Sequence, residues 1–145
     1  MQTIELLTSN PLQDNQDEVS LPLYRMSVSV GTPLPTDEDI EEEIDLNSFL
    51  VKHPNSTFFA RVIGDAENFD SIRNGDVLVI DTYQKPDDGK LILVQMNKNL
   101  TIRRYRLFDD QEYIQTPNSQ YLPINSSFFD TLDYVGQITF IIHTL

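Results

Sequence analysis

The sequence predicts a mainly β fold, an antiparallel sandwich or partly open barrel, with one short helix and an extended N-terminal arm. From Thr57 onward, short runs of β-branched and aromatic residues alternate with segments containing Pro, Asn, Asp or Gly, as in strands joined by turns. The chain of 145 residues is long enough for one domain with a core. We therefore expect a flexible arm over residues 1–44, ending in an acidic linker, and a single β domain over residues 45–145.

Six segments have the clearest strand pattern: Phe58–Ile63, Val77–Thr82, Leu91–Met96, Leu100–Leu107, Glu112–Thr116 and Val135–His143. A short helix is predicted to begin after Asp45, whose carboxylate can cap it, and to end before Pro54. The apolar face of this helix would consist of Leu46, Phe49 and Leu50.

Two segments of the arm have patterns of their own. Met26–Gly31 alternates polar and apolar residues, which predicts one extended strand. Asp37–Asp45 carries carboxylates at every position except Ile40 and Ile44. We interpret it as a solvated, self-repelling linker. The alternative is one helical turn held down by the two isoleucines at i, i+4 spacing.

Composition excludes several classes of function. The net charge of −13 disfavours direct binding to nucleic acid, which needs clustered positive charge. The absence of cysteine excludes disulfides and thiolate metal sites, and no apolar run is long enough to span a membrane. His53 and His143 stand apart from other ligand types, so we expect no metal and no cofactor. The start lacks the features of a secretory signal, and we expect a soluble cytoplasmic protein.

The stretch Phe58–Asp81 organises the candidate site. It reads as a strand ending at Gly64-Asp65, an irregular loop, a tight Gly75-Asp76 turn and a second strand. A loop held between two buried strands is a rigid platform on which a site can be built. We expect Asp65 to cap this loop by accepting backbone N–H groups.

This stretch resembles the core motif of the LexA/UmuD family, which are self-cleaving serine peptidases of the bacterial DNA-damage response. In that family the residue after Gly-Asp is the nucleophilic serine, and a lysine further along the chain is its base. Ala66 stands at the serine position here, and Arg103 stands at the lysine position with the family's spacing. The similarity runs from about Leu21 to His143, and the bond that corresponds to the family's cleavage site is Val30–Gly31.

Both substitutions remove the family's chemistry. Ala66 has no oxygen with which to attack, and a guanidinium such as that of Arg103 stays protonated in proteins and cannot act as a base. Ser71 and Lys98 lie too far along the chain to replace the pair, because small misplacements already cost catalysis heavily. Glu67, where the family has methionine, favours natural drift over an engineered knock-out.

The resemblance therefore implies a catalytically inactive UmuD-like protein, a pseudo-peptidase that acts as a dimerising and binding subunit. It would serve the SOS response and error-prone translesion DNA synthesis, or its regulation. The implied partners are a second copy or an active UmuD-type paralogue, a Y-family DNA polymerase and the RecA filament. An active partner would cut Val30–Gly31 in trans.

Two other functions stay open. The chain can be an antirepressor or decoy that binds a LexA-type repressor, or a working peptidase that cuts Val30–Gly31 with a displaced dyad. The segment before that bond is too short for the winged DNA-binding domain of LexA-type repressors, so we do not expect a full-length repressor.

Overall fold

The computed structural model describes residues 3–6, 19–27, 31, 33–64, 71–116, 118–125 and 132–145. The chain divides into two compact units, one formed by Met1–Asn10 with His53–Leu145 and the other by Pro11–Lys52. The predicted boundary between residues 44 and 45 and the predicted flexibility of the arm stay predictions.

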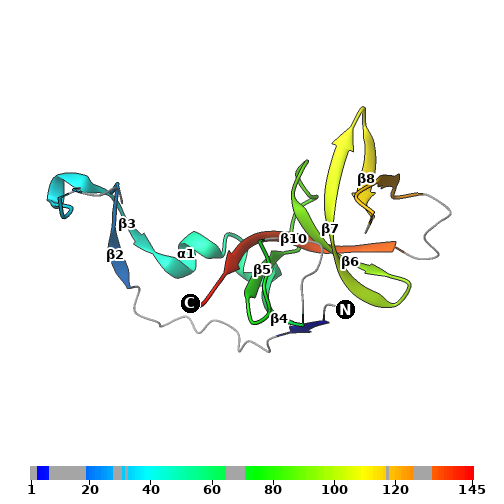
Figure 1. The fold of residues 1–145 in the computed structure, drawn as a ribbon, viewed down its shortest axis with the longest axis horizontal. Helices are drawn as coiled ribbons and strands as arrows, with labels where there is room; N and C mark the ends of the chain where they lie inside the picture. The colour runs from blue at the N-terminus through cyan, green and yellow to red at the C-terminus, as the bar shows by residue number, and fades with distance from the viewer. Residues whose placement is uncertain are drawn as a thin grey trace. The chain divides into compact units, whose positions relative to one another are not determined.

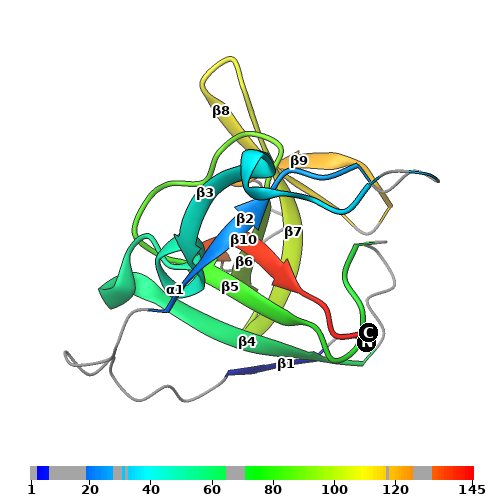
Figure 2. The same cartoon turned by 90° about the vertical axis from the view of Figure 1, so that its left-hand side faces the viewer.

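The larger unit is an eight-stranded sheet with the order β1-β4-β5-β10-β6-β7-β8-β9 (Figure 1, Figure 2). Every pairing in it is antiparallel. Its strands are β1 Thr3–Leu6, β4 Thr57–Ile63, β5 Val77–Asp81, β6 Leu91–Met96, β7 Asn99–Phe108, β8 Gln111–Gln115, β9 Tyr121–Pro123 and β10 Leu132–Ile142. A 3-10 turn, η2 Pro54–Ser56, precedes β4. Since β1 and β9 stand at opposite ends of the order, the sheet is not closed. The prediction of a mainly β, antiparallel fold with one short helix is confirmed.

The six strands predicted from sequence correspond to β4, β5, β6, β7, β8 and β10, with ends within a few residues. The β6–β7 hairpin turns at Asn97 and Lys98, both with positive φ, and the β7–β8 hairpin turns at Asp109 and Asp110, again both positive. Two central residues with positive φ are typical of the tight turn that matches the twist of paired strands. These turns fix the register of the three strands.

The core consists of two apolar clusters. One contains Ala60, Val62, Ile72, Leu78, Ile80, Leu93, Ile102 and Ile138. The other contains Ile92, Val94, Tyr105 and Ile114. Successive residues of a strand point to opposite faces, so β6, in which Ile92, Leu93 and Val94 are all buried, contributes to both. Burial on both faces explains why β6 reads as a continuous apolar run instead of an alternating one.

The smaller unit contains a two-stranded antiparallel sheet, β2 Ser20–Tyr24 with β3 Ile40–Asp45. A 3-10 turn, η1 Asp37–Asp39, precedes β3, and helix α1 Leu46–Leu50 follows it. Asp45 caps α1 as predicted, its carboxylate accepting the Asn47 N–H at 3.2 Å. In the described part of the chain no helix is long and apolar enough to cross a membrane.

Two predictions for this unit are wrong. The strand expected at Met26–Gly31 lies earlier, at β2, and Met26 and Ser27 belong to no strand; residues 28–30 lie outside the described part. In the acidic run Asp37–Asp45, the first three residues form the 3-10 turn η1 and Ile40–Asp45 form β3, so most of the run is a strand and not a solvated linker or a helical turn held by Ile40 and Ile44. Residues at i and i+4 share a face in a strand as they do in a helix, so the spacing of Ile40 and Ile44 did not distinguish the two.

Candidate functional site

The turn before β5 is tightly bonded to β4. The Gly75 N–H donates to the Val62 carbonyl at 2.7 Å, and the Val62 N–H donates to the Asp76 carbonyl at 2.8 Å. The Gly64 N–H donates to the side-chain oxygen of Asn74 at 2.7 Å. Gly64 and Gly75 have φ of 101° and 90°, a region that favours glycine. The predicted platform is therefore held by main-chain bonds on both sides of its loop.

A buried carboxylate closes this turn. Asp76 is 1% exposed, and its two oxygens accept from the Arg73 N–H at 2.8 Å and from His143 Nδ1 at 2.6 Å. Arg73 Nη1 lies 3.5 Å from Nε2 of the same histidine. Since His143 follows β10, the pair joins the start of β5 to a segment 67 residues away.

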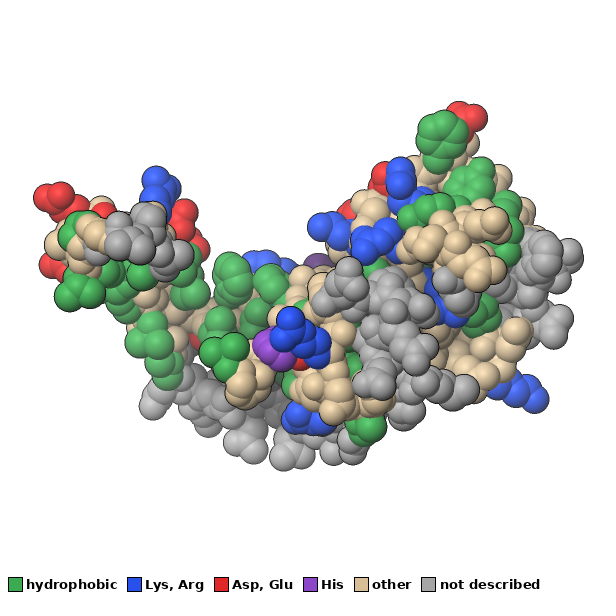
Figure 3. All heavy atoms as spheres, viewed as in Figure 1, with side chains coloured by type: hydrophobic (Ala, Val, Ile, Leu, Met, Phe, Trp, Pro, Cys, Tyr) green, Lys and Arg blue, Asp and Glu red, His purple; other side chains and the backbone are tan. Residues whose placement is uncertain are grey.

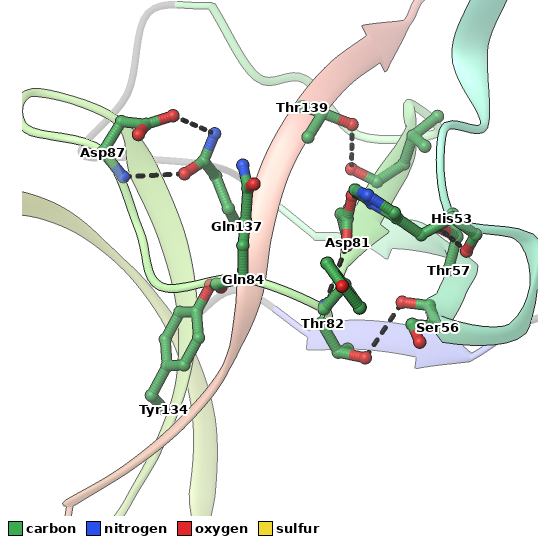
Figure 4. A network of polar contacts seen from close by, with 12 residues as sticks. His53, Ser56, Thr57, Asp81, Thr82, Gln84, Asp87, Tyr134, Gln137 and Thr139 are labelled. Carbon is green, nitrogen blue, oxygen red and sulfur yellow. Dashed lines mark hydrogen bonds and ion pairs between the residues drawn. The ribbon is translucent and has the colours of Figure 1, made fainter.

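A second buried carboxylate stands at the other end of β5. Asp81 is 5% exposed, and its oxygens accept from His53 Nδ1 at 2.5 Å and from the Tyr83 N–H at 2.8 Å (Figure 4). The His53 ring stacks on the Tyr83 ring with centroids 4.2 Å apart. The two histidines, which looked isolated in the sequence, thus each bind an aspartate at one end of β5: Asp76 directly before the strand and Asp81 as its last residue. Sequence spacing gave no signal of these pairs, which join residues distant along the chain.

Further polar contacts join the segment after β5 to β10 (Figure 4). The Tyr134 hydroxyl donates to the Gln84 carbonyl at 3.0 Å, and the Asp87 N–H donates to the side-chain oxygen of Gln137 at 2.9 Å. Burial, with the negative charges of Asp81 and Asp87, raises the pKa of Tyr134 to about 12. This segment is therefore fixed to the strand that crosses the centre of the sheet.

Arg103, at the predicted lysine position, lies on β7 opposite Ile92 of β6. The side chain is half-buried, and Nη1 donates to the Ile102 carbonyl at 2.9 Å. Burial lowers the pKa of the guanidinium. Among the described residues no carboxylate forms an ion pair with Arg103. The group is thus a half-buried cation that donates one hydrogen bond to a backbone oxygen.

The neighbouring arginines differ from each other. Arg106 is exposed and pairs with Asp88 at 2.9 Å, as expected for a solvent-facing residue. Arg104, in contrast, is half-buried, and its Nη1 donates to the Gly89 carbonyl at 2.7 Å. The reason is its place opposite Leu91, a residue packed against the larger core cluster.

A shallow groove of about 430 Å³ runs beside Arg104. Its wall includes Ser71, Lys90, Leu91, Thr139 and Phe140. Ser71, considered above as a substitute nucleophile, therefore shares a groove with Lys90. Lys98, considered as the substitute base, instead occupies the turn between β6 and β7, and it does not line this groove.

Several predicted site positions lie outside the described residues. These are Asp65, Ala66 and Glu67 in the platform loop, and Val30 at the cleavage-like bond. Gly31, the other side of that bond, is exposed and has a φ of 87°. The degenerate dyad at Ala66 and Arg103 and the capping role of Asp65 therefore stay predictions. In the described ranges no three His, Asp or Glu side chains gather as they would to hold a metal ion.

Comparison with known proteins places this geometry in a family. The model of the family described as Peptidase S24-like matches residues 22–139. The chain is 31% identical over 126 residues to protein SamA of Salmonella typhimurium strain LT2, and the aligned residues cover 84% of each protein. It is 33% identical over 107 residues to protein ImpA of Escherichia coli, covering 74% of this chain and 72% of ImpA. It is also 28% identical to the LexA repressor of Shewanella oneidensis over 114 residues, which cover only 53% of that repressor.

Proposed function

The chain belongs to the Peptidase S24-like family, and from that premise we propose that it is an inactive member serving as a dimerising and binding subunit in SOS mutagenesis. The observation that carries the proposal is the pair of residues at the two catalytic positions. Ala66 replaces the nucleophilic serine, and Arg103 replaces the lysine base.

The surroundings of Arg103 support the loss of a base. A lysine can serve as a base when burial lets it lose its proton. Burial lowers the pKa of Arg103 too, but a guanidinium starts so high that it stays protonated at any pH at which the protein works. Its donated bond to the Ile102 carbonyl further stabilises the charged form.

The two strands that flank the platform loop, in contrast, are bonded to each other and to neighbouring segments. The Gly75 turn is bonded to β4, and Asp76 and Asp81 each accept two hydrogen bonds. Flanking strands that are held in this way suit a protein that other members of its family recognise. Similarity over most of SamA and ImpA, against half of a LexA repressor, favours a mutagenesis subunit over a repressor.

The partners of such a subunit follow from its family. We propose a homodimer, or a heterodimer with an active paralogue that cuts Val30–Gly31 in trans, and a Y-family DNA polymerase as the client. The antirepressor hypothesis instead proposes a LexA-type repressor as the partner, and binding assays with such a repressor and with a polymerase distinguish the two.

One observation favours the peptidase hypothesis as a second candidate. Ser71 and Lys90 line the same groove, so a serine hydroxyl and an amine are both available near the platform. Under that hypothesis Ser71→Ala abolishes any self-cleavage of the purified chain. Under ours, there is no self-cleavage to abolish.

Restoring the two residues tests the proposal. We expect Ala66→Ser alone to remain uncut, because no base is present, and Ala66→Ser with Arg103→Lys to cut Val30–Gly31 at alkaline pH. Intact mass after incubation gives the readout, and Ser71→Ala in the double variant is the matched control that should not change the rate. Cleavage by Ala66→Ser alone would overturn the role assigned to Arg103.

A further inference from the structure

We propose that the edge of β3 facing β2 is an acceptor site for a basic strand of a partner protein. In the intact chain β2 occupies this edge, and scission between the two strands opens it. The opening step rests on the proposed function, which places a cut at Val30–Gly31, while the acceptor property of β3 does not.

The first observation is that β2 is weakly held. No described residue between 19 and 52 is buried. In β2 itself, Leu21 is 61% exposed and Tyr24 is 37% exposed, and Pro22 contributes no main-chain N–H. The ribbon has apolar cross-strand pairs, Leu21 with Ile44 and Tyr24 with Ile40, but none of these residues is buried, and an isolated pair of strands is marginally stable at best. The β2–β3 pairing therefore depends on its covalent connection.

The second observation is a mismatch of charge across the ribbon. In the observed register Asp45 stands opposite Ser20, Glu43 opposite Pro22, and Glu42 opposite Leu23, which are the partners given by the strand pairing. None of these β2 residues is a cation. An ion pair joins Arg25 to Glu41 at 3.7 Å with both side chains exposed, and such pairs contribute little.

The acidic side chains gather over β3 and the turn before it, the part of Figure 3 that corresponds to β2 and β3 in Figure 1. Opposite charges directly across an antiparallel pair are stabilising. A strand with Lys or Arg opposite Glu43 and Asp45 would thus pair with β3 better than β2 does. This chemistry identifies the partner as an extended basic segment that adds to a sheet edge.

The third observation is topological. Residues 25–39 connect β2 to β3, and Gly31 in this connection is exposed. A cut there removes the direct connection between β2 and β3, so the two strands stay linked only by the longer path through β1 and β4, which lowers the effective concentration of β2. The pairing of β1 with β4 would still hold the N-terminal end of the cut fragment. The fragment therefore stays attached when β2 leaves β3.

The experiment cuts the chain with an added enzyme. A recognition sequence for a site-specific protease is inserted after Gly31, and hydrogen exchange of the β3 amides is followed before and after the cut. Two probe peptides cover residues 18–26, one with Ser20→Lys and Pro22→Lys and the other with Ser20→Glu and Pro22→Glu. Both probes lack the proline, so they differ only in charge.

We expect the cut to raise exchange of the β3 amides and the lysine probe to restore their protection. The lysine probe should bind the cut protein at least about threefold more tightly than the glutamate probe, given the small gain of each cross-strand pair, and this preference should shrink with salt. Unchanged β3 protection after the cut, or equal binding of the two probes, would overturn the inference. Because the protease is supplied, a paralogue's failure to cut Val30–Gly31 would count against the proposed function alone.

Discussion

Asp76 offers the sharpest test of how the platform is held, because one buried side chain closes the turn and binds the C-terminal segment. Asp76→Ala leaves the Arg73 N–H and His143 Nδ1 without the acceptors that lie 2.8 and 2.6 Å away. Hydrogen bonds to a charged group are worth about 1.5–3 kcal/mol each, and Asp76→Ala removes two of them. We expect the free energy of unfolding to fall by about 3–5 kcal/mol.

Urea unfolding measures this loss. For a chain of this size the expected fall corresponds to a midpoint lower by about 2 M. Asp76→Asn keeps the shape and one oxygen acceptor, so it should lie between Asp76→Ala and wild type and remain folded if the alanine variant does not. Asp133→Ala, an exposed acid on β10, is the matched control. If Asp76→Ala loses no more stability than this control, the buried carboxylate does not hold the turn.

Two further changes probe the sheet. Gly136→Ala would place a Cβ 2.7 Å from Cγ2 of Ile80 and 2.9 Å from the Asp81 carbonyl oxygen. Because the backbone at Asp81 cannot move away easily, we expect the free energy of unfolding in urea to fall by about 1–3 kcal/mol. A midpoint equal to that of wild type would refute the close approach. Tyr134 has its pKa raised to about 12, above its ordinary value near 10, so its contribution to stability is complete below about pH 10 and disappears as pH rises through about 12. Tyr134→Phe should therefore flatten the fall in stability over that interval, and an unchanged pH profile would contradict the assignment.

The strands of the larger unit were predictable because burial on one or both faces leaves an apolar pattern. β5 is buried at every position after its first residue, and β6 is buried at Ile92, Leu93 and Val94. β4 alternates at its end with Ala60 and Val62 inside. The edge strands β1 and β9 were missed, since they are short and their order in the sheet depends on partners far along the chain. Local pattern carries little information on such pairing.

Charge misled the prediction of β3. A run of carboxylates is typical of a solvated linker, yet β3 pairs with β2 in a ribbon without buried residues among those described, so its side chains remain in water and its sequence shows no strand signal. The two His–Asp pairs were missed for a different reason. Their partners are 28 and 67 residues apart, and only the folded sheet brings them together.

The candidate site was predictable only through its motif. Gly64 and Gly75 have positive φ, Gly75 and Asp76 are bonded to Val62, and Arg103 is half-buried on β7, while the site roles that the motif indicates for these residues stay predictions. The half-burial of Arg104, and a groove shared by Ser71 and Lys90, depend on strand register and had no local signal.

The central claim is that this chain does not cut itself but is cut by an active relative. The direct measurement is the intact mass of the purified protein after long incubation, alone and mixed with an active member of the family. We predict no change for the protein alone and a cut at Val30–Gly31 in the mixture. A cut at that bond in the protein alone would contradict the account, because Ala66 and Arg103 could not then be the residues at a dead site.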